Sequence, residues 1–167
     1  GGAQRAGTKI GVTGALIVRV GVGEAPARVM TRTDNDQLHV THNGETALAS
    51  VMELAQFATR IERKRNIGRG NPNAHWMSHD GQKMVTPNVF TGDTTQYDFP
   101  SDRIDAILPT SSKLSHPIAT GMMPNASKYY VANLLDSTRT VIDMEHHSVL
   151  TTINLITNYN PVTVAIT

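Results

Sequence analysis

Hydrophobic and polar residues alternate over several short stretches of the chain, and this alternation predicts β-strands. In the first forty residues the stretches are Lys9 to Val22, Ala27 to Thr33 and Gln37 to Thr41, with turn-forming residues between them, so they predict a β-meander. Five more strands are predicted after residue 102: Arg103 to Leu108, Lys128 to Leu135, Thr138 to Met144, Val149 to Thr157 and Val162 to Thr167. The last two are expected to pair as a hairpin, and Tyr129 to Leu135 also fits a helical turn or two.

One stretch has helical spacing, from Glu45 to Arg65. Its apolar residues recur at the interval that places them on one side of a helix, and they are Ala47, Val51, Leu54, Ala55, Ala58 and Ile61. Asn43 or Thr46 can cap the start, and Gly68 can end the helix. Basic residues crowd the last turns, where the helix dipole favours cations. We therefore expect one central amphipathic helix.

Residues 66–102 are rich in Gly, Asn, Pro and His and have no periodicity, so they predict a long irregular loop region. The fold class expected from these patterns is α+β, mainly antiparallel β in a sandwich-like or barrel-like arrangement, with the one central amphipathic helix. We expect a single domain over residues 1–167. Residues 1–8 form its flexible N-terminal arm, and the sequence shows no evident internal repeat.

The composition narrows the range of functions. The chain has no cysteine, which excludes disulfide frameworks, thiolate metal sites and cysteine nucleophiles. The net charge is +1, which argues against binding a polyanion through bulk charge. Charged residues make up only 17% of the chain, so Thr and Asn supply much of its polarity. A surface with so little charge repels its own copies weakly, and this favours self-association.

The densest basic run predicts a contact with nucleic acid. It consists of Arg60, Arg63, Lys64, Arg65 and Arg69. Such cations can bind phosphates, but they also fit simple compensation of the dipole at a helix end. The aromatic residues that single-strand binders place among their cations are absent from this run.

Two groups of histidines are candidate metal ligands. His75 and His79 are four residues apart and would share one side of a helix. The metalloprotease motif HExxH is incomplete because Trp76 stands where the glutamate is needed. The run from Met144 to His147 also holds two imidazoles, but adjacent residues of a strand face opposite sides. No cofactor is expected, and a backbone-bonded loop is the simpler interpretation of His75 and His79.

No complete catalytic motif is present. The glycine pairs near residues 21 and 68 lack the continuation of a phosphate-binding loop, and no GxSxG motif occurs. The sequence therefore does not favour an enzyme. A small metal-dependent hydrolase that uses the histidine-containing loop is kept as an alternative, as is a nucleic-acid-contacting module.

The function that the sequence favours is a structural, self-assembling subunit. The expected type is a virion protein of a virus or phage, such as a capsid, tube or decoration subunit, or else a filament subunit. Its partners would be copies of itself and, as a second possibility, genomic nucleic acid, with no membrane involved; it would lie in a virion or an extracellular assembly. The expected assembly contacts are Gly1, Gly2, Trp76, Met122 and Met123.

Overall fold

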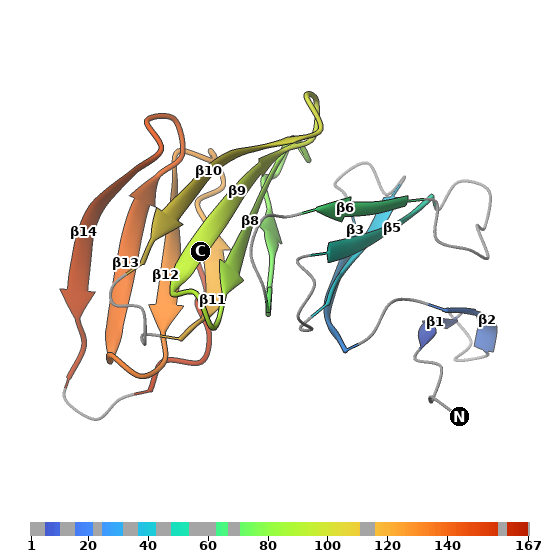
Figure 1. Cartoon of the computed structure of the whole chain (residues 1–167), viewed down its shortest axis with the longest axis horizontal. Helices are drawn as coiled ribbons and strands as arrows, with labels where there is room; N and C mark the ends of the chain where they lie inside the picture. The colour runs from blue at the N-terminus through green and yellow to red at the C-terminus, as the bar shows by residue number, and fades with distance from the viewer. Residues whose placement is uncertain are drawn as a thin grey trace.

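The computed structural model of the chain describes residues 6–10, 16–21, 25–31, 37–42, 48–53, 63–66, 71–110, 116–156 and 160–166. Within these ranges every regular element is a β-strand (Figure 1), and no helix is long and apolar enough to cross a membrane. The strands are β1 (Ala6–Ile10), β2 (Leu16–Gly21), β3 (Pro26–Thr31), β4 (Gln37–His42), β5 (Leu48–Glu53), β6 (Arg63–Asn66), β7 (Trp76–Met77), β8 (Lys83–Asn88), β9 (Asp93–Asp98), β10 (Arg103–Pro109), β11 (Pro117–Met122), β12 (Lys128–Asn133), β13 (Thr138–Asp143) and β14 (Ser148–Asn154).

The strands form sheets strictly in chain order. After the β1–β2 pair come three four-stranded sheets, in which every strand pairs antiparallel with its sequence neighbour. We call them the first unit (β3–β6), the second unit (β7–β10) and the third unit (β11–β14). Figure 1 shows the second and third units on the left and the first unit to their right. Consecutive four-stranded antiparallel sheets of this kind are the blades of β-propellers.

The second and third units are two copies of one repeat. From Lys83 to Lys128, the first residues of β8 and β12, the step is 45 residues, and β9 to β13 and β10 to β14 repeat it. A repeat of about 40–45 residues is the length expected for one propeller blade. Few side chains are identical at equivalent positions. The identical pairs include Pro72 and Pro117, Met77 and Met122, Asn88 and Asn133, Thr95 and Thr140, and Asp98 and Asp143.

Loop hydrogen bonds repeat with the same step. The backbone N–H of Thr110 donates to the carbonyl of Gly92 at 3.0 Å. In the third unit Leu155 donates in the same way to Ser137 at 2.9 Å. Gly92 and Ser137 both have positive φ, 70° and 50°. The repeat is therefore conserved in backbone geometry even where the side chains differ.

A buried asparagine closes the same turn in both units. In the second unit the Asn88 side-chain amide donates to Asp93 at 2.7 Å and to Thr95 at 3.0 Å. In the third unit the amide of its equivalent, Asn133, donates to hydroxyl oxygens. The acceptors are Thr138 at 3.0 Å and Thr140 at 2.9 Å. Both asparagines are fully buried, and these hydrogen bonds satisfy their amide N–H groups, whereas their Oδ1 atoms have no hydrogen-bond partner among the described residues.

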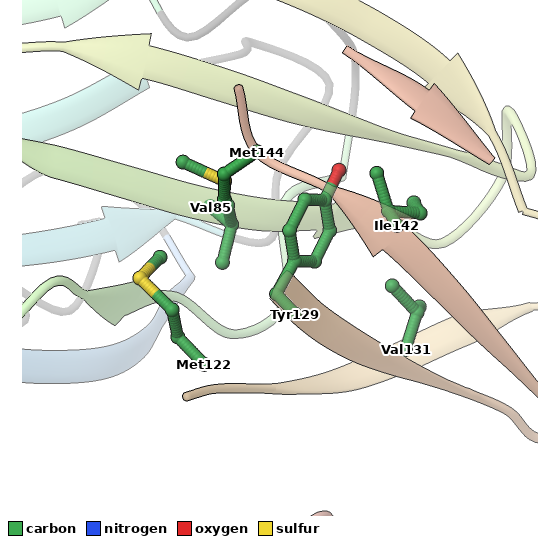
Figure 2. Close-up of a cluster of buried hydrophobic side chains, with 6 residues drawn as sticks. All are labelled: Val85, Met122, Tyr129, Val131, Ile142 and Met144. Carbon is green, nitrogen blue, oxygen red and sulfur yellow. The ribbon is translucent and has the colours of Figure 1, made fainter. Parts of the chain in front are cut away.

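The second and third units pack face to face. Tyr129, Val131 and Ile142 of the third unit point to one side and meet Val85 of the second unit (Figure 2). Met122 and Met144 complete this apolar cluster, and Leu108 packs against it. Because successive residues of a strand face opposite sides, each unit has one face towards the preceding unit and one towards the next. We call the latter its outward face.

The first and second units are in contact through described side chains as well. The ring of His39 on β4 meets that of Phe99 edge to face, with 4.9 Å between centroids. Phe99 belongs to a buried cluster with Met77, Met84 and Tyr97, and Met30 of β3 packs against it. The pairwise packing of successive units thus includes the first one.

The C-terminal segment, Pro161–Ile166, lies on the outward face of the third unit. Val164 is buried there with Ala119 and Ala132, and Ile166 packs beside them. A methyl group added at Gly121 would come within 2.8 Å of the Val164 side chain, so glycine permits this close approach. No strand is assigned to the segment, which corrects the expected C-terminal hairpin.

The prediction of a central amphipathic helix over Glu45 to Arg65 is wrong. Leu48–Glu53 is strand β5, which pairs with β4, and Arg63–Asn66 is strand β6, which pairs with β5. Residues 54–62 lie outside the described part. The fold class is therefore all-β within the described residues, because pairing with the neighbouring strands outweighs the helical spacing of the apolar residues.

Three other expectations are also corrected. The supposed irregular loop region at 66–102 contains β7, β8 and β9. An internal repeat is present, as the 45-residue step shows. Strand β1 begins within the supposed arm of residues 1–8, whose first five residues lie outside the described part.

Strands were correctly predicted in the last third of the chain, where β10, β12, β13 and β14 lie at the expected places.

Candidate functional site

His75 lies at the contact between the first and second units. Its side chain is 4% exposed, and Nδ1 lies 3.2 Å from the hydroxyl oxygen of Thr41 on β4. Burial is the main cause that lowers the pKa of His75 to about 4, and the positive charge of Arg28 lowers it further. At neutral pH the ring is therefore uncharged and serves as a hydrogen-bonding link between two units.

The structure separates His75 from His79. His79 is exposed in the turn after β7, and there is no helix there to place both imidazoles on one side. The described residues contain no cluster of three His, Asp or Glu side chains that can hold a metal ion. The second histidine pair is also divided. His146 lies 3.2 Å from Asp143 of its own turn, whereas His147 contacts Gln96 of the second unit.

The predicted basic site is placed on a strand instead of a helix end. Arg63, Lys64 and Arg65 belong to β6, which is the edge strand of the first unit. Arg60 and Arg69 lie outside the described residues.

The predicted assembly contacts have different environments. Trp76 on β7 is 37% exposed, so its ring is partly available to a partner. Met122 is buried in the cluster between the second and third units, and Met123 is half-buried in the following turn. Gly1 and Gly2 lie outside the described residues. Of the five, Trp76 is the one that the structure places with a large exposed side chain.

A charged cluster around Lys83 was not predicted from the sequence. Its ammonium group lies 2.7 Å from both Asp98 and Asp105, which come from neighbouring strands. Desolvation is the largest influence on Asp98 and raises its pKa, but hydrogen bonds from Lys83 and Ser101 outweigh it and lower the pKa to about 2. The carboxylate therefore stays ionised at neutral pH, and this cluster ties the outer strands of the second unit together.

The outward face of the third unit is less covered than that of the second. Leu108 on β10 is half-buried against the third unit, whereas its equivalent Ile153 on β14 is 44% exposed. Ala106 is half-buried and its equivalent Thr151 is exposed. The covering segment Pro161–Ile166 reaches the inner strands of the third unit and leaves β14 open. Of the features described, this uncovered region is the one best suited to bind a partner.

Consecutive four-stranded antiparallel sheets, two of them related by a 45-residue step, are similar in arrangement to the blades of β-propellers. The solved hydrazine synthase of Kuenenia stuttgartiensis is similar in fold, with a TM-score of 0.72 and 16% sequence identity. The match covers 83% of this chain and 38% of that chain, so this chain spans well under half of that protein's length. No family model and no curated protein matches the chain.

These comparisons show the fold alone. At 16% identity the likeness transfers no substrate, cofactor or catalytic residue to this chain. The fold is also widespread, because 912 solved chains match it, and a fold so common does not select one function. The function must therefore be argued from the surfaces of the units themselves.

Proposed function

We propose that the chain is an assembly module that binds copies of itself through its third unit. The second unit buries its outward face against the third, and this contact combines an apolar cluster with hydrogen bonds that join Tyr129 to Thr94 and Gln96. The third unit has an outward face of the same construction but lacks a complete cover. An apolar face that is left partly open in this way favours contact with a partner.

The main support for this proposal is a difference in exposure between equivalent residues of the second and third units. Leu108 and Ile153 have the same place in the repeat, yet Leu108 is packed against the next unit and Ile153 is 44% exposed. Ile153 is already more than half covered, so burying its remaining surface stabilises a complex by about 1 kcal/mol before the costs of association. The burial of apolar surface on the third unit therefore favours its association with a second copy.

The experiment is light scattering of the full chain over a range of concentrations. The proposal expects the mean mass to rise above 18.1 kDa, the mass of one chain, as the concentration increases. A mass that stays at 18.1 kDa up to millimolar concentration would contradict it. A virion or an extracellular location rests on composition alone and is not part of the proposal.

Contact with nucleic acid is a second candidate, supported by the three consecutive cations on the edge strand β6. Replacing Arg63, Lys64 and Arg65 by alanine is expected to weaken binding to single-stranded RNA and to flatten its salt dependence. Replacing Lys128, which lies on the third unit, by alanine is the control. Equal binding by the triple variant and the unmodified chain would remove this candidate.

A further inference from the structure

Strand β14 is an edge strand with an unusual surface. It forms the outer edge of the third unit, and no other described strand pairs with its free side. Val149, Leu150 and Ile153 are 39%, 48% and 44% exposed, and the strand contains no charged residue. A long, uncharged edge with exposed apolar side chains readily pairs with a strand of another chain.

The equivalent edge of the second unit is protected. Strand β10 carries Arg103, Asp105 and Pro109, and charges and proline are the residues that prevent edge pairing. Asp105 is also held at 2.7 Å from Lys83, so its charge is fixed at this edge. In β14 the same three repeat positions are Ser148, Leu150 and Asn154. The third unit thus lacks all three protective residues where the second unit has them.

We propose that β14 pairs antiparallel with β14 of a second copy of this chain, so that two third units join into one continuous sheet. This inference rests on the proposed function, because it specifies the contact through which the copies associate. A second copy fits because an antiparallel pair of identical strands has twofold symmetry and places the same patch on both sides. Since β14 carries no charge, such a pair has no like charges opposite one another.

The first test gives β14 the residues that protect β10. In the full chain the changes are Ser148→Arg, Leu150→Asp and Asn154→Pro. Strand β10 accommodates these residues at the same places in the repeat, so the third unit is expected to stay folded. Sedimentation velocity is expected to show self-association weakened at least tenfold. Glu145→Gln, in the exposed turn before β14, is the matched control and is expected to associate like the unmodified chain.

The second test uses the absence of cysteine from the chain, since any disulfide then reports the introduced position. Thr151→Cys and Thr152→Cys sample both sides of β14 near its centre. Under mild oxidation at least one of them is expected to form a disulfide-linked dimer, because directly opposed side chains in a sheet come within bonding range. Ala106→Cys is the control, since this position in β10 is equivalent to Thr151.

The outcomes separate the inference from the proposed function. If the protected triple variant associates as strongly as the unmodified chain, pairing through β14 is wrong, although self-association stands. If Ala106→Cys cross-links as well as both β14 variants, the contact is unspecific and the inference also fails. If the unmodified chain is monomeric throughout, both proposals fail. Loss of the dimer in a folded triple variant, with cross-linking confined to β14, supports the inference.

Discussion

The hydroxyl oxygens of Tyr129 and Thr94 lie 2.9 Å apart, fully buried at the contact between the third and second units. The Gln96 side-chain amide donates to the same Tyr129 oxygen at 3.3 Å, and either hydroxyl can be the donor between Tyr129 and Thr94. Burial raises the pKa of Tyr129 to about 12, so the proton is retained at neutral pH. Two units are thus joined by a polar contact inside an apolar cluster.

Replacing Tyr129 by phenylalanine is expected to destabilise the chain by about 1–3 kcal/mol. The ring keeps its apolar contacts, but Thr94 and Gln96 lose a buried partner. Urea unfolding followed by circular dichroism measures the change. Tyr130→Phe is the control, because its half-buried side chain lies on the other side of the strand. Equal effects of the two substitutions would show that the Tyr129 hydroxyl has no special role.

The stability of the fold is expected to depend on His75 in mildly acidic solution. Its pKa is about 4 when folded and about 6.5 when unfolded, so between these values the unfolded chain binds more protons. Stability therefore falls as the pH decreases from about 6.5 to 4, by roughly 3 kcal/mol from this group. His75→Thr introduces the residue found at the equivalent position in the third unit, Thr120, and is expected to flatten the dependence. The free energy of unfolding is measured by urea titration at several pH values. If its dependence on pH is the same in His75→Thr as in the unmodified chain, this assignment is contradicted.

Positions with positive φ make a matched pair of substitutions possible. Ser137 has a φ of 50° where the second unit has Gly92 with a φ of 70°. Ser137→Gly is expected to stabilise the fold and Gly92→Ser to destabilise it, each by about 1 kcal/mol, because this conformation is strained for residues with a side chain. Thermal unfolding of both variants tests the prediction. Shifts of the same sign in both variants would count against equivalent turns.

Gly121→Ala is expected to displace the C-terminal segment from the third unit. The new methyl group would lie 2.8 Å from a Val164 methyl, which is too close for the present packing. Faster proteolysis within Pro161–Ile166 is the expected result. Adding Val164→Ala removes the obstructing group and is expected to slow cleavage again. If Gly121→Ala leaves cleavage unchanged, the close approach of the segment is wrong.

Local patterns predicted the strands best where apolar and polar residues alternate. This is true of β12 and β13, where Tyr129, Val131 and Ile142 point to one face. The same reasoning failed for β8 and β9, because they bury polar side chains that resemble those of a loop. These buried residues are Thr86, Asn88, Thr94, Thr95 and Gln96. Thr94 and Gln96, for example, hydrogen-bond to Tyr129 of the next unit, which a short sequence window does not contain.

The false helix and the missed repeat have separate physical causes. Val51 and its neighbours have helical spacing, but β5 is held as a strand by pairing with β4, and this pairing is not a local property. The repeat is not evident in the sequence because equivalent positions share burial more than identity, as the fully buried Met84 and Tyr129 illustrate. The difference between β14 and β10 lies between two units 45 residues apart, so no single stretch of the sequence shows it.

The most direct test of the account is amide hydrogen exchange of the full chain at low and high concentration. If two copies associate through the third unit, the amides of β14 exchange more slowly as the concentration rises, while the exchange rates of the β10 amides stay unchanged. Exchange in β14 that is independent of concentration, or protection that appears equally in β10, would contradict the account.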